Sequence, residues 1–185
     1  MALRVIAGTV GGRRLVAPKG DARPTTDRLK EALFASLGPR TRDTTVLDLF
    51  CGSGALAIEA LSRGARRAVL VDRDRAAASA VRANLDATGF DDRARFDQAT
   101  VTSFLARPVP EAPFDLVFLD PPYEVPAADV AAVLQALDDA DVVAADGTVV
   151  VERARGGAAV VLPDGWRTEK ERAYGDTLLV VARAG

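Results

Sequence analysis

Blocks of apolar and polar positions alternate along the chain, and from residue 46 onward they predict strands and helices in turn. Apolar runs typical of buried strands occur at 46–50, 68–71, 114–119 and 148–151, and 94–97 is a weaker strand candidate. Apolar residues at helical spacing lie between them, at 55–63, 74–88, 101–107 and 130–140. This pattern predicts an α/β fold in which helices cover both faces of a mostly parallel sheet.

The two ends of the chain have patterns of their own. Residues 3–7 and 13–16 flank a glycine-rich turn and predict a hairpin, followed by a helix that begins near Thr25 or Thr26 and ends at Gly38-Pro39. At the other end, 160–162 and 177–181 are expected to form an antiparallel pair around Trp166.

Composition limits the chemistry that the chain can perform. With 185 residues and 49% hydrophobic side chains, one domain with a sizeable core is expected. No leader-like or membrane-spanning apolar run is visible, so we expect a soluble, cytoplasmic protein. The chain has one cysteine and no histidine, which argues against a disulfide or a metal site. Its chemistry must therefore come from carboxylates, amides, hydroxyls, backbone groups or a borrowed cofactor.

Charge is unevenly distributed. Residues 1–42 hold nine Lys and Arg against three Asp and Glu, a balance of +6, although the whole chain carries −2. A basic segment on an acidic body predicts contact with a polyanion, and a solvated charged face is the alternative.

The stretch from Val46 to Gly54 is the centre of the functional interpretation. It reads as a buried strand, a tight turn through Gly52 and Gly54, and a helix N-terminus whose N–H groups face a ligand. Asp48 lies inside the apolar strand, where a carboxylate needs a ligand cation or a backbone N–H of the turn as its partner. An ordinary strand–turn–helix corner with a solvated Asp48 is the plainer alternative.

Asp72 ends the next predicted strand, 18 residues after Gly54. That spacing suits an acid that binds ribose hydroxyls, so a nucleoside cofactor is indicated. Residues 52–57 also fit a dinucleotide-binding pattern, but no hydride-transfer site accompanies it.

The tetrapeptide Asp120-Pro121-Pro122-Tyr123 follows a strong apolar strand and decides between these interpretations. The Asp120 carboxylate and the Pro121 carbonyl form an acceptor pair that can hold the two hydrogens of a nucleobase amino group. Proline fixes the backbone, and Tyr123 offers a face on which the base stacks. The expected electrophile is a methyl sulfonium, with catalysis mostly by positioning.

These motifs resemble those of class I S-adenosylmethionine-dependent methyltransferases, and more narrowly the RsmD family of 16S ribosomal RNA guanine-N2 methyltransferases (guanine 966). The matching segments run nearly from end to end: 4–8, 12–15, 23–28 with Glu31 and Phe34, 48–56, 59–65, 120–123 and 151–152. The resemblance implies a Rossmann-like, seven-stranded sheet with an antiparallel C-terminal strand and an N-terminal hairpin extension. It also implies a basic RNA-contacting unit at 1–38 and a methyltransferase domain at 39–185.

The resemblance implies roles for individual residues as well. The catalytic residues are those of the 120–123 tetrapeptide. Cofactor contacts are expected from Asp48, Phe50, Gly52, Ser53, Gly54, Asp72, Arg73, Thr25 and Thr26, with either Asp97 or Thr100 at the adenine. RNA contacts are expected from Arg4, Arg13, Arg14, Arg23 and Arg28.

The implied substrate is small-subunit ribosomal RNA or an assembling 30S particle, modified by a monomer. Two alternatives remain open: an adenine-N6 nucleic-acid methyltransferase, which shares the tetrapeptide, and an inactive RNA-binding module. The short chain lacks a separate DNA-recognition domain, and its complete cofactor set argues for cofactor binding.

Overall fold

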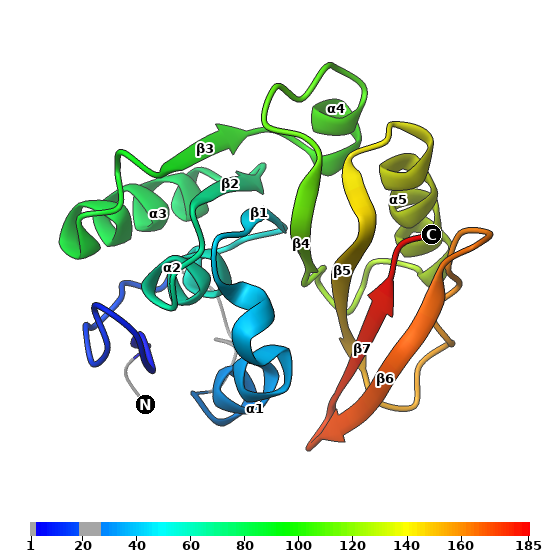
Figure 1. Cartoon of the computed structure of the whole chain (residues 1–185), viewed down its shortest axis with the longest axis horizontal. Coiled ribbons are helices and arrows are strands. Elements are labelled where there is room, and N and C mark those ends of the chain that lie inside the picture. The colour runs from blue at the N-terminus through cyan, green and yellow to red at the C-terminus, as the bar shows by residue number, and fades with distance from the viewer. Residues whose placement is uncertain (1–2, 19–26) are drawn as a thin grey trace.

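A seven-stranded sheet forms the centre of the molecule (Figure 1). The computed structural model describes residues 3–18 and 27–185. The sheet order is β3-β2-β1-β4-β5-β7-β6, with bounds Thr45–Leu49 (β1), Arg67–Asp72 (β2), Ala94–Gln98 (β3), Phe114–Leu119 (β4), Val143–Ala154 (β5), Arg167–Tyr174 (β6) and Thr177–Arg183 (β7). Strands β1 to β5 pair in parallel, whereas β7 runs antiparallel to β5 and β6. The predicted seven-stranded fold is confirmed.

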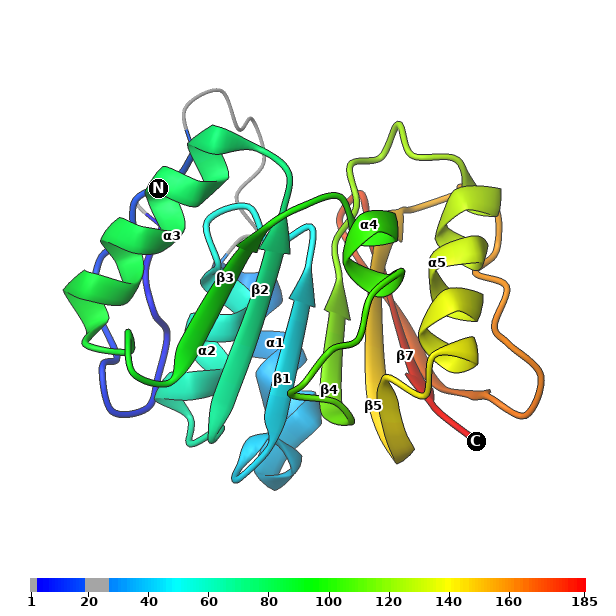
Figure 2. The ribbon, with the colours of Figure 1, turned by 90° about the horizontal axis from the view of Figure 1, so that it is seen from above.

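Helices cover both faces of this sheet (Figure 2). Their bounds are Asp27–Leu37 (α1), Ala55–Ser62 (α2), Arg75–Thr88 (α3), Val101–Leu105 (α4) and Ala127–Asp139 (α5), with a 3₁₀ turn at Gly38–Thr41. Alternate strand residues face opposite layers, so Val46 packs with α1, α2 and α3 while Leu47 packs with α4 and α5. The buried strands are therefore apolar on both sides, which explains their nearly continuous hydrophobic runs. Among the described residues, no helix is long and apolar enough to cross a membrane.

The strand order reverses between β1 and β4. From β1 the chain builds outward to β2 and β3, and from β4 it builds in the other direction to β5. Helices attached to β1 and β4 therefore leave in opposite directions, and a crevice opens at the carboxyl ends of these two strands. The predicted functional residues follow β1, β2 and β4 at this edge.

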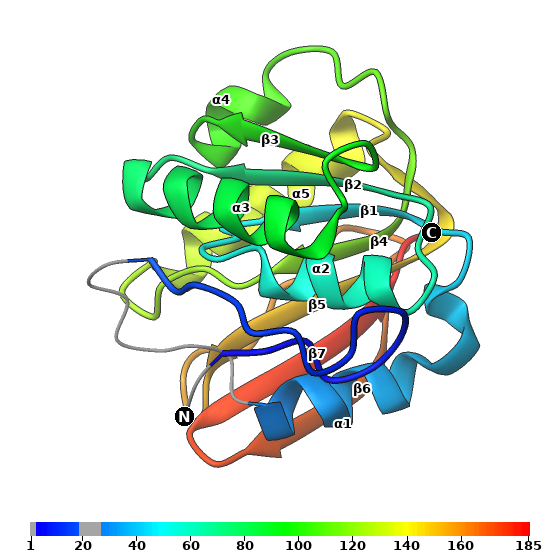
Figure 3. The same ribbon diagram turned by 90° about the vertical axis from the view of Figure 1, so that its left-hand side faces the viewer.

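Residues 3–18 form an N-terminal arm that turns back on itself, so the predicted antiparallel pairing of 3–7 with 13–16 is present but short. Its two halves share one bridge, Arg4 to Arg14, with backbone bonds on either side of it. Leu3, Val5 and Leu15 are buried against the helical layer. The arm runs beside α2 (Figure 3), and its backbone N–H groups find partners on that helix instead of in a longer strand pair.

Two side chains of α2 hold this arm in place. Glu59 is fully buried and accepts hydrogen bonds from the N–H groups of Ile6 and Ala7 at 2.7 and 3.1 Å. Ser62 accepts from the Val10 N–H and donates to the Ala7 carbonyl. The arm passes so close to α2 at Gly8, where φ is +90°, that a Cβ there would lie 2.0 Å from the Ser62 carbonyl oxygen.

The C-terminal antiparallel pair was placed wrongly by the sequence pattern. The partner of β7 is β6, at Arg167–Tyr174, and residues 160–162 lie outside any strand. The side chains of β6 are mostly exposed because this strand is the edge of the sheet. In the segment 160–162, the apolar Val161 is also exposed, at 64%, and therefore contributes no buried strand. Trp166 precedes β6, is buried, and donates from Nε1 to the Asp138 carboxylate at 2.8 Å.

Candidate functional site

The turn between β1 and α2 is built from residues with left-handed backbone conformations. Phe50, Gly52 and Gly54 have φ values of +59°, +53° and +75°. A positive φ at a phenylalanine is a strained conformation that the surrounding structure must hold, and such residues cluster at ligand sites. At Gly54 a Cβ would lie 2.6 Å from the Leu70 side chain, so only glycine lets α2 approach the sheet there.

Asp48 projects from β1 beneath this turn and is 1% exposed. Its Oδ2 accepts a hydrogen bond from the Ala57 N–H at 3.0 Å, whereas its Oδ1 has no hydrogen-bond partner among the described residues. Burial raises the pKa of this carboxyl to about 8; the Ala57 hydrogen bond opposes this rise, and the nearby carboxylates of Asp120 and Asp72 contribute to it. An orphaned, buried acceptor at the cavity wall fits a ligand that brings a cation.

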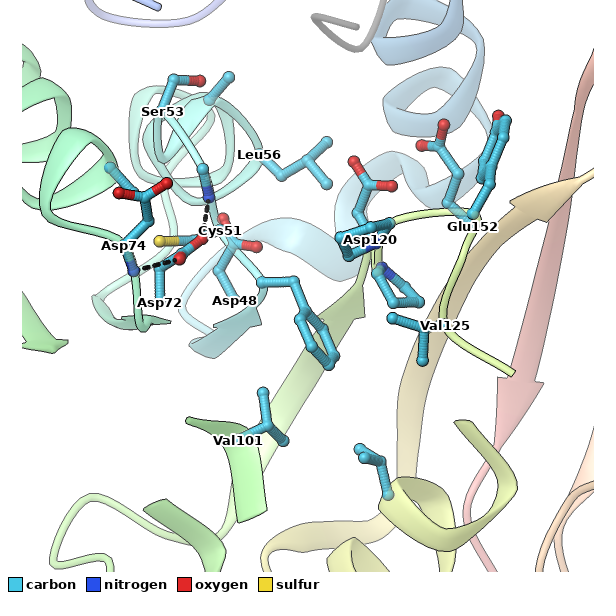
Figure 4. A pocket seen from close by; sticks show the side chains of 18 of the residues that line it. Asp48, Cys51, Ser53, Leu56, Asp72, Asp74, Val101, Asp120, Val125 and Glu152 are labelled. Carbon is cyan, nitrogen blue, oxygen red and sulfur yellow. Dashed lines mark hydrogen bonds between the residues drawn. The ribbon is translucent and has the colours of Figure 1, made fainter. Parts of the chain in front are cut away.

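Asp72 ends β2 and holds two backbone segments together. Its Oδ2 accepts from the Gly52 N–H and its Oδ1 from the Asp74 N–H, both at 2.9 Å (Figure 4). Asp74 in turn caps α3 by accepting from the Ala76 N–H. A carboxylate has about four acceptor positions, so Asp72 keeps the capacity to bind hydroxyl groups while it fixes the glycine turn.

A cavity of about 1970 Å³ opens above these residues. It is lined by Asp48, Asp72 and Asp120 from three strand ends, and by side chains of α4 and of the β6–β7 turn. Pockets for a single small ligand usually measure ~300–1,000 Å³. The cavity is therefore large enough for a nucleoside cofactor and a second group together.

The four residues of the tetrapeptide line the same cavity, immediately after β4. The Tyr123 hydroxyl lies 2.8 Å from Thr177 Oγ1, which fixes the ring at the cavity wall. The Asp120 N–H donates to the Leu49 carbonyl at 3.4 Å, so the tetrapeptide is tied to the end of β1. The tetrapeptide and most of the residues predicted to bind the cofactor thus line one cavity at the β1–β4 crevice.

The structure brings most of the other predicted residues to this cavity. Its lining includes Phe50, Ser53, Arg73, Thr100 and Arg28. Gly54 instead precedes α2 as its N-cap residue. The predicted residues Arg23, Thr25 and Thr26 lie outside the described residues.

The two candidates for the adenine contact separate in the structure. Asp97 lies outside the cavity lining and forms ion pairs with Arg95 and Arg107 at 2.9 and 2.5 Å. Burial opposes ionisation of Asp97, but the hydrogen bonds from Arg107 and Arg95 outweigh it and hold its pKa below the ordinary value. Thr100 caps α4 by accepting from the Ser103 N–H, and it faces the cavity. Of the two, Thr100 is the residue in position to meet a ligand.

Sequence reasoning assigned no role to Glu152, although this buried residue of β5 lines the cavity. Its Oε1 lies 3.5 Å from Thr177 Oγ1, the same hydroxyl that contacts Tyr123. Leu3 and Pro18 of the N-terminal arm also reach the lining. Within the described part of the chain, no group of three or more His, Cys, Asp or Glu side chains is arranged to hold a metal ion.

Comparison with known proteins gives the family. The model of the family described as "Conserved hypothetical protein 95" matches residues 3–183. This chain belongs to that family, the RsmD family. It is 36% identical to the ribosomal RNA small subunit methyltransferase D of Escherichia coli over 94% of this chain and 85% of the relative. It is 33% identical to the Haemophilus influenzae protein of the same name, over 94% and 89% of the two chains.

Solved structures agree with this membership. The Escherichia coli protein yhhF, assigned as a methyltransferase, superposes with a TM-score of 0.88 at 35% identity, covering 100% of this chain and 98% of yhhF. The fold of this chain therefore matches that of yhhF over nearly the whole length of both proteins.

Proposed function

We propose that this RsmD-family protein transfers a methyl group from S-adenosylmethionine to the exocyclic N2 amino group of a guanine in small-subunit ribosomal RNA. One observation carries the proposal: the Asp-Pro-Pro-Tyr tetrapeptide and Asp48, whose Oδ1 has no partner among the described residues, line one cavity at the β1–β4 crevice. The names of its relatives supply the RNA class. We further propose that the protein acts as a monomer in the cytoplasm, on free RNA or on an assembling 30S particle.

The cofactor site is built from the ends of β1 and β2. Asp48 Oδ1 suits the ammonium group of the methionine portion, because a buried acceptor without a partner gains most from a charged donor. Asp72 suits the ribose hydroxyls, and Thr100 the adenine. When bound, S-adenosylmethionine supplies an electrophilic methyl carbon on a sulfonium sulfur.

The tetrapeptide prepares the nucleophile. The amino nitrogen of guanine is a weak nucleophile because its lone pair is delocalised into the ring. Asp120 and the Pro121 carbonyl can each accept one amino hydrogen and so aim the lone pair toward the methyl group. The Asp120 carboxylate would take the proton that the amino group loses as the new N–C bond forms and the methyl–sulfur bond of the sulfonium breaks, leaving a thioether. Tyr123, held by Thr177, supports the base by stacking, worth about 1–3 kcal/mol.

The N-terminal arm suits the RNA contact. Arg4 and Arg14 are bridged residues on adjacent segments and are both exposed, as is Arg13. Like charges placed opposite one another destabilise a strand pair unless an anion lies between them. Arg4 is partly neutralised by Asp27 at 2.8 Å, and phosphates of RNA would balance the remainder.

The reaction is tested by incubating the protein with S-adenosylmethionine and small-subunit RNA or particles, followed by mass spectrometry of the nucleosides. N2-methylguanosine is the expected product. N6-methyladenosine would instead establish the adenine alternative. Cofactor binding by calorimetry with no methylated nucleoside on RNA or particles would refute the proposed activity.

The RNA face is tested by reversing two charges. Arg13→Glu with Arg14→Glu should reduce RNA methylation strongly, make the remaining activity less dependent on salt, and leave cofactor affinity unchanged. The matched control reverses Arg66 and Arg67, an exposed pair where β2 begins, at the sheet edge opposite the cavity. Equal rates for both double variants would show that the arm is only a solvated charged surface.

A further inference from the structure

The cavity contains a second carboxylate beside the catalytic tetrapeptide. In the parallel pairing of β4 with β5, Leu119 lies opposite Val151. Asp120 and Glu152 are the next residue on each strand, so they occupy neighbouring positions at the carboxyl edge. Figure 4 shows both carboxylates directed to the same side of the sheet. Both residues line the cavity.

Strand pairing and burial fix the position of Glu152 at the cavity wall. Val151 is fully buried, and Glu152 itself is 8% exposed although it carries a carboxyl group. Glu152 pairs with Leu179 of β7, and the preceding Val151 pairs with Leu119 of β4. Thr177 Oγ1 lies between its Oε1 and the Tyr123 hydroxyl, at 3.5 and 2.8 Å. Glu152 and Tyr123 thus lie in the same part of the cavity wall, where a base stacked on Tyr123 would come close to Glu152.

Guanine and adenine differ in what they present next to the reacting amino group. Guanine carries two neighbouring donors, the N2 amino group and the N1–H. Adenine carries its N6 amino group beside N1, which is an acceptor. A wall with two adjacent carboxylates offers acceptors to both guanine donors, whereas its second carboxylate would face the lone pair of adenine N1. A flipped base is read through this edge.

We infer that Glu152 determines the specificity for guanine by accepting a hydrogen bond from N1–H while Asp120 holds the N2 amino group. This inference rests on the proposed function and names the residue that selects its substrate.

The base analogue 2-aminopurine provides the test, because it keeps the 2-amino group but has an acceptor at N1. Nucleoside mass spectrometry first locates the guanine that the wild-type protein methylates, and RNA is then prepared with guanine or 2-aminopurine at that position. We expect wild-type kcat/KM to be at least tenfold lower on 2-aminopurine, since a hydrogen bond to a charged group is worth about 10- to 150-fold. Comparable wild-type rates on the two bases would overturn the inference.

A swap of donor and acceptor makes the test specific. In Glu152→Gln the amide can donate to N1 of 2-aminopurine, so the guanine preference should fall by tenfold or more, with the rate on 2-aminopurine maintained or raised. Thr177→Val is the matched control, because it removes the hydroxyl between Tyr123 and Glu152 but keeps the carboxylate. It should lower both rates together and leave the preference unchanged.

The outcomes separate the inference from the proposed function. If Glu152→Gln lowers kcat/KM equally on guanine and 2-aminopurine, with cofactor affinity intact, Glu152 has only a structural role in the cavity wall. A wild-type protein that methylates neither base, or that methylates adenine, would instead refute the proposed function. Calorimetric titration with S-adenosylmethionine confirms that each variant retains the folded cofactor site.

Discussion

The buried carboxyl of Asp48 predicts that cofactor binding releases a proton. Burial raises its pKa to about 8, so in the free protein this side chain is almost fully protonated at pH 6.5. The ammonium group of S-adenosylmethionine favours the ionised form. Binding at pH 6.5 should therefore release close to one proton, and ionising Asp48 at this pH consumes about 2 kcal/mol of binding free energy, at 1.36 kcal/mol per pH unit.

The released proton makes the affinity depend on pH with a defined sign. Because the free protein holds the proton and the complex does not, raising the pH favours the complex, and Kd should fall about tenfold between pH 5.5 and 6.5. The chain contains no histidine, so no side chain with an ordinary pKa titrates in this interval. Asp48→Asn cannot ionise and should bind more weakly, with an affinity that does not change over the same interval.

Isothermal titration calorimetry measures this release directly when it is repeated in two buffers of different ionisation enthalpy. Asp74→Asn is a suitable control, since Asp74 lines the same cavity and asparagine also caps helices well. It should keep the wild-type proton release. A wild-type Kd that is constant from pH 5.5 to 6.5, or a slope that survives in Asp48→Asn, would refute the assignment of Asp48 to the cofactor's cation.

Three further substitutions and modifications test the rest of the site. Asp120→Ala should abolish methyl transfer and leave S-adenosylmethionine affinity nearly intact, and a variant that loses affinity but transfers normally when bound would contradict the orienting role. Asp72→Ala should weaken the cofactor by about 10- to 150-fold, the worth of hydrogen bonds to a charged acceptor, and an unchanged Kd would remove it from the ribose site. Cys51, whose thiol pKa is raised by burial, lines the cavity and should be alkylated more slowly when cofactor is bound. Equal alkylation rates with and without cofactor would place Cys51 away from it.

The parts of the site that the sequence predicted correctly are those encoded locally. The strand–turn–helix at 45–62 and the strand before Asp120 are strong apolar runs that end in glycine or proline, so pattern and turn chemistry agree. Parallel strands then bring their carboxyl ends to one edge by geometry alone. Three acidic residues at three strand ends therefore had to lie near one another.

The edge of the sheet was harder to predict because its pattern is not hydrophobic. Strand β6 has the sequence RTEKERAY, with charged side chains on both faces. Such charges protect an exposed strand edge from pairing with other chains, but they also remove the alternation by which a strand is recognised. The segment 160–162 is apolar and therefore resembles a strand more than β6 does, although it forms no strand.

Long-range polar contacts were not readable from spacing either. Glu59 and Arg63 do form the expected i,i+4 pair at 2.7 Å. The same buried carboxylate, however, also binds two backbone N–H groups of the N-terminal arm more than 50 residues away. The i,i+4 spacing predicted Arg63 as a partner of Glu59. It could not predict the N–H groups of Ile6 and Ala7, whose hydrogen bonds to Glu59 fix the arm to α2.

Asn84 connects the N-terminal arm to the proposed cofactor site. It is fully buried in α3, and its amide donates to the carbonyls of Val16 in the arm and Ser53 in the cofactor turn, both at 2.9 Å. Its Oδ1 accepts from the Val16 N–H at 2.7 Å. One side chain therefore joins the proposed RNA-binding arm to the turn beside Asp48. The division at residue 38 is then a proposed division of roles within one packed structure, since the arm's buried leucines belong to the same core as α2.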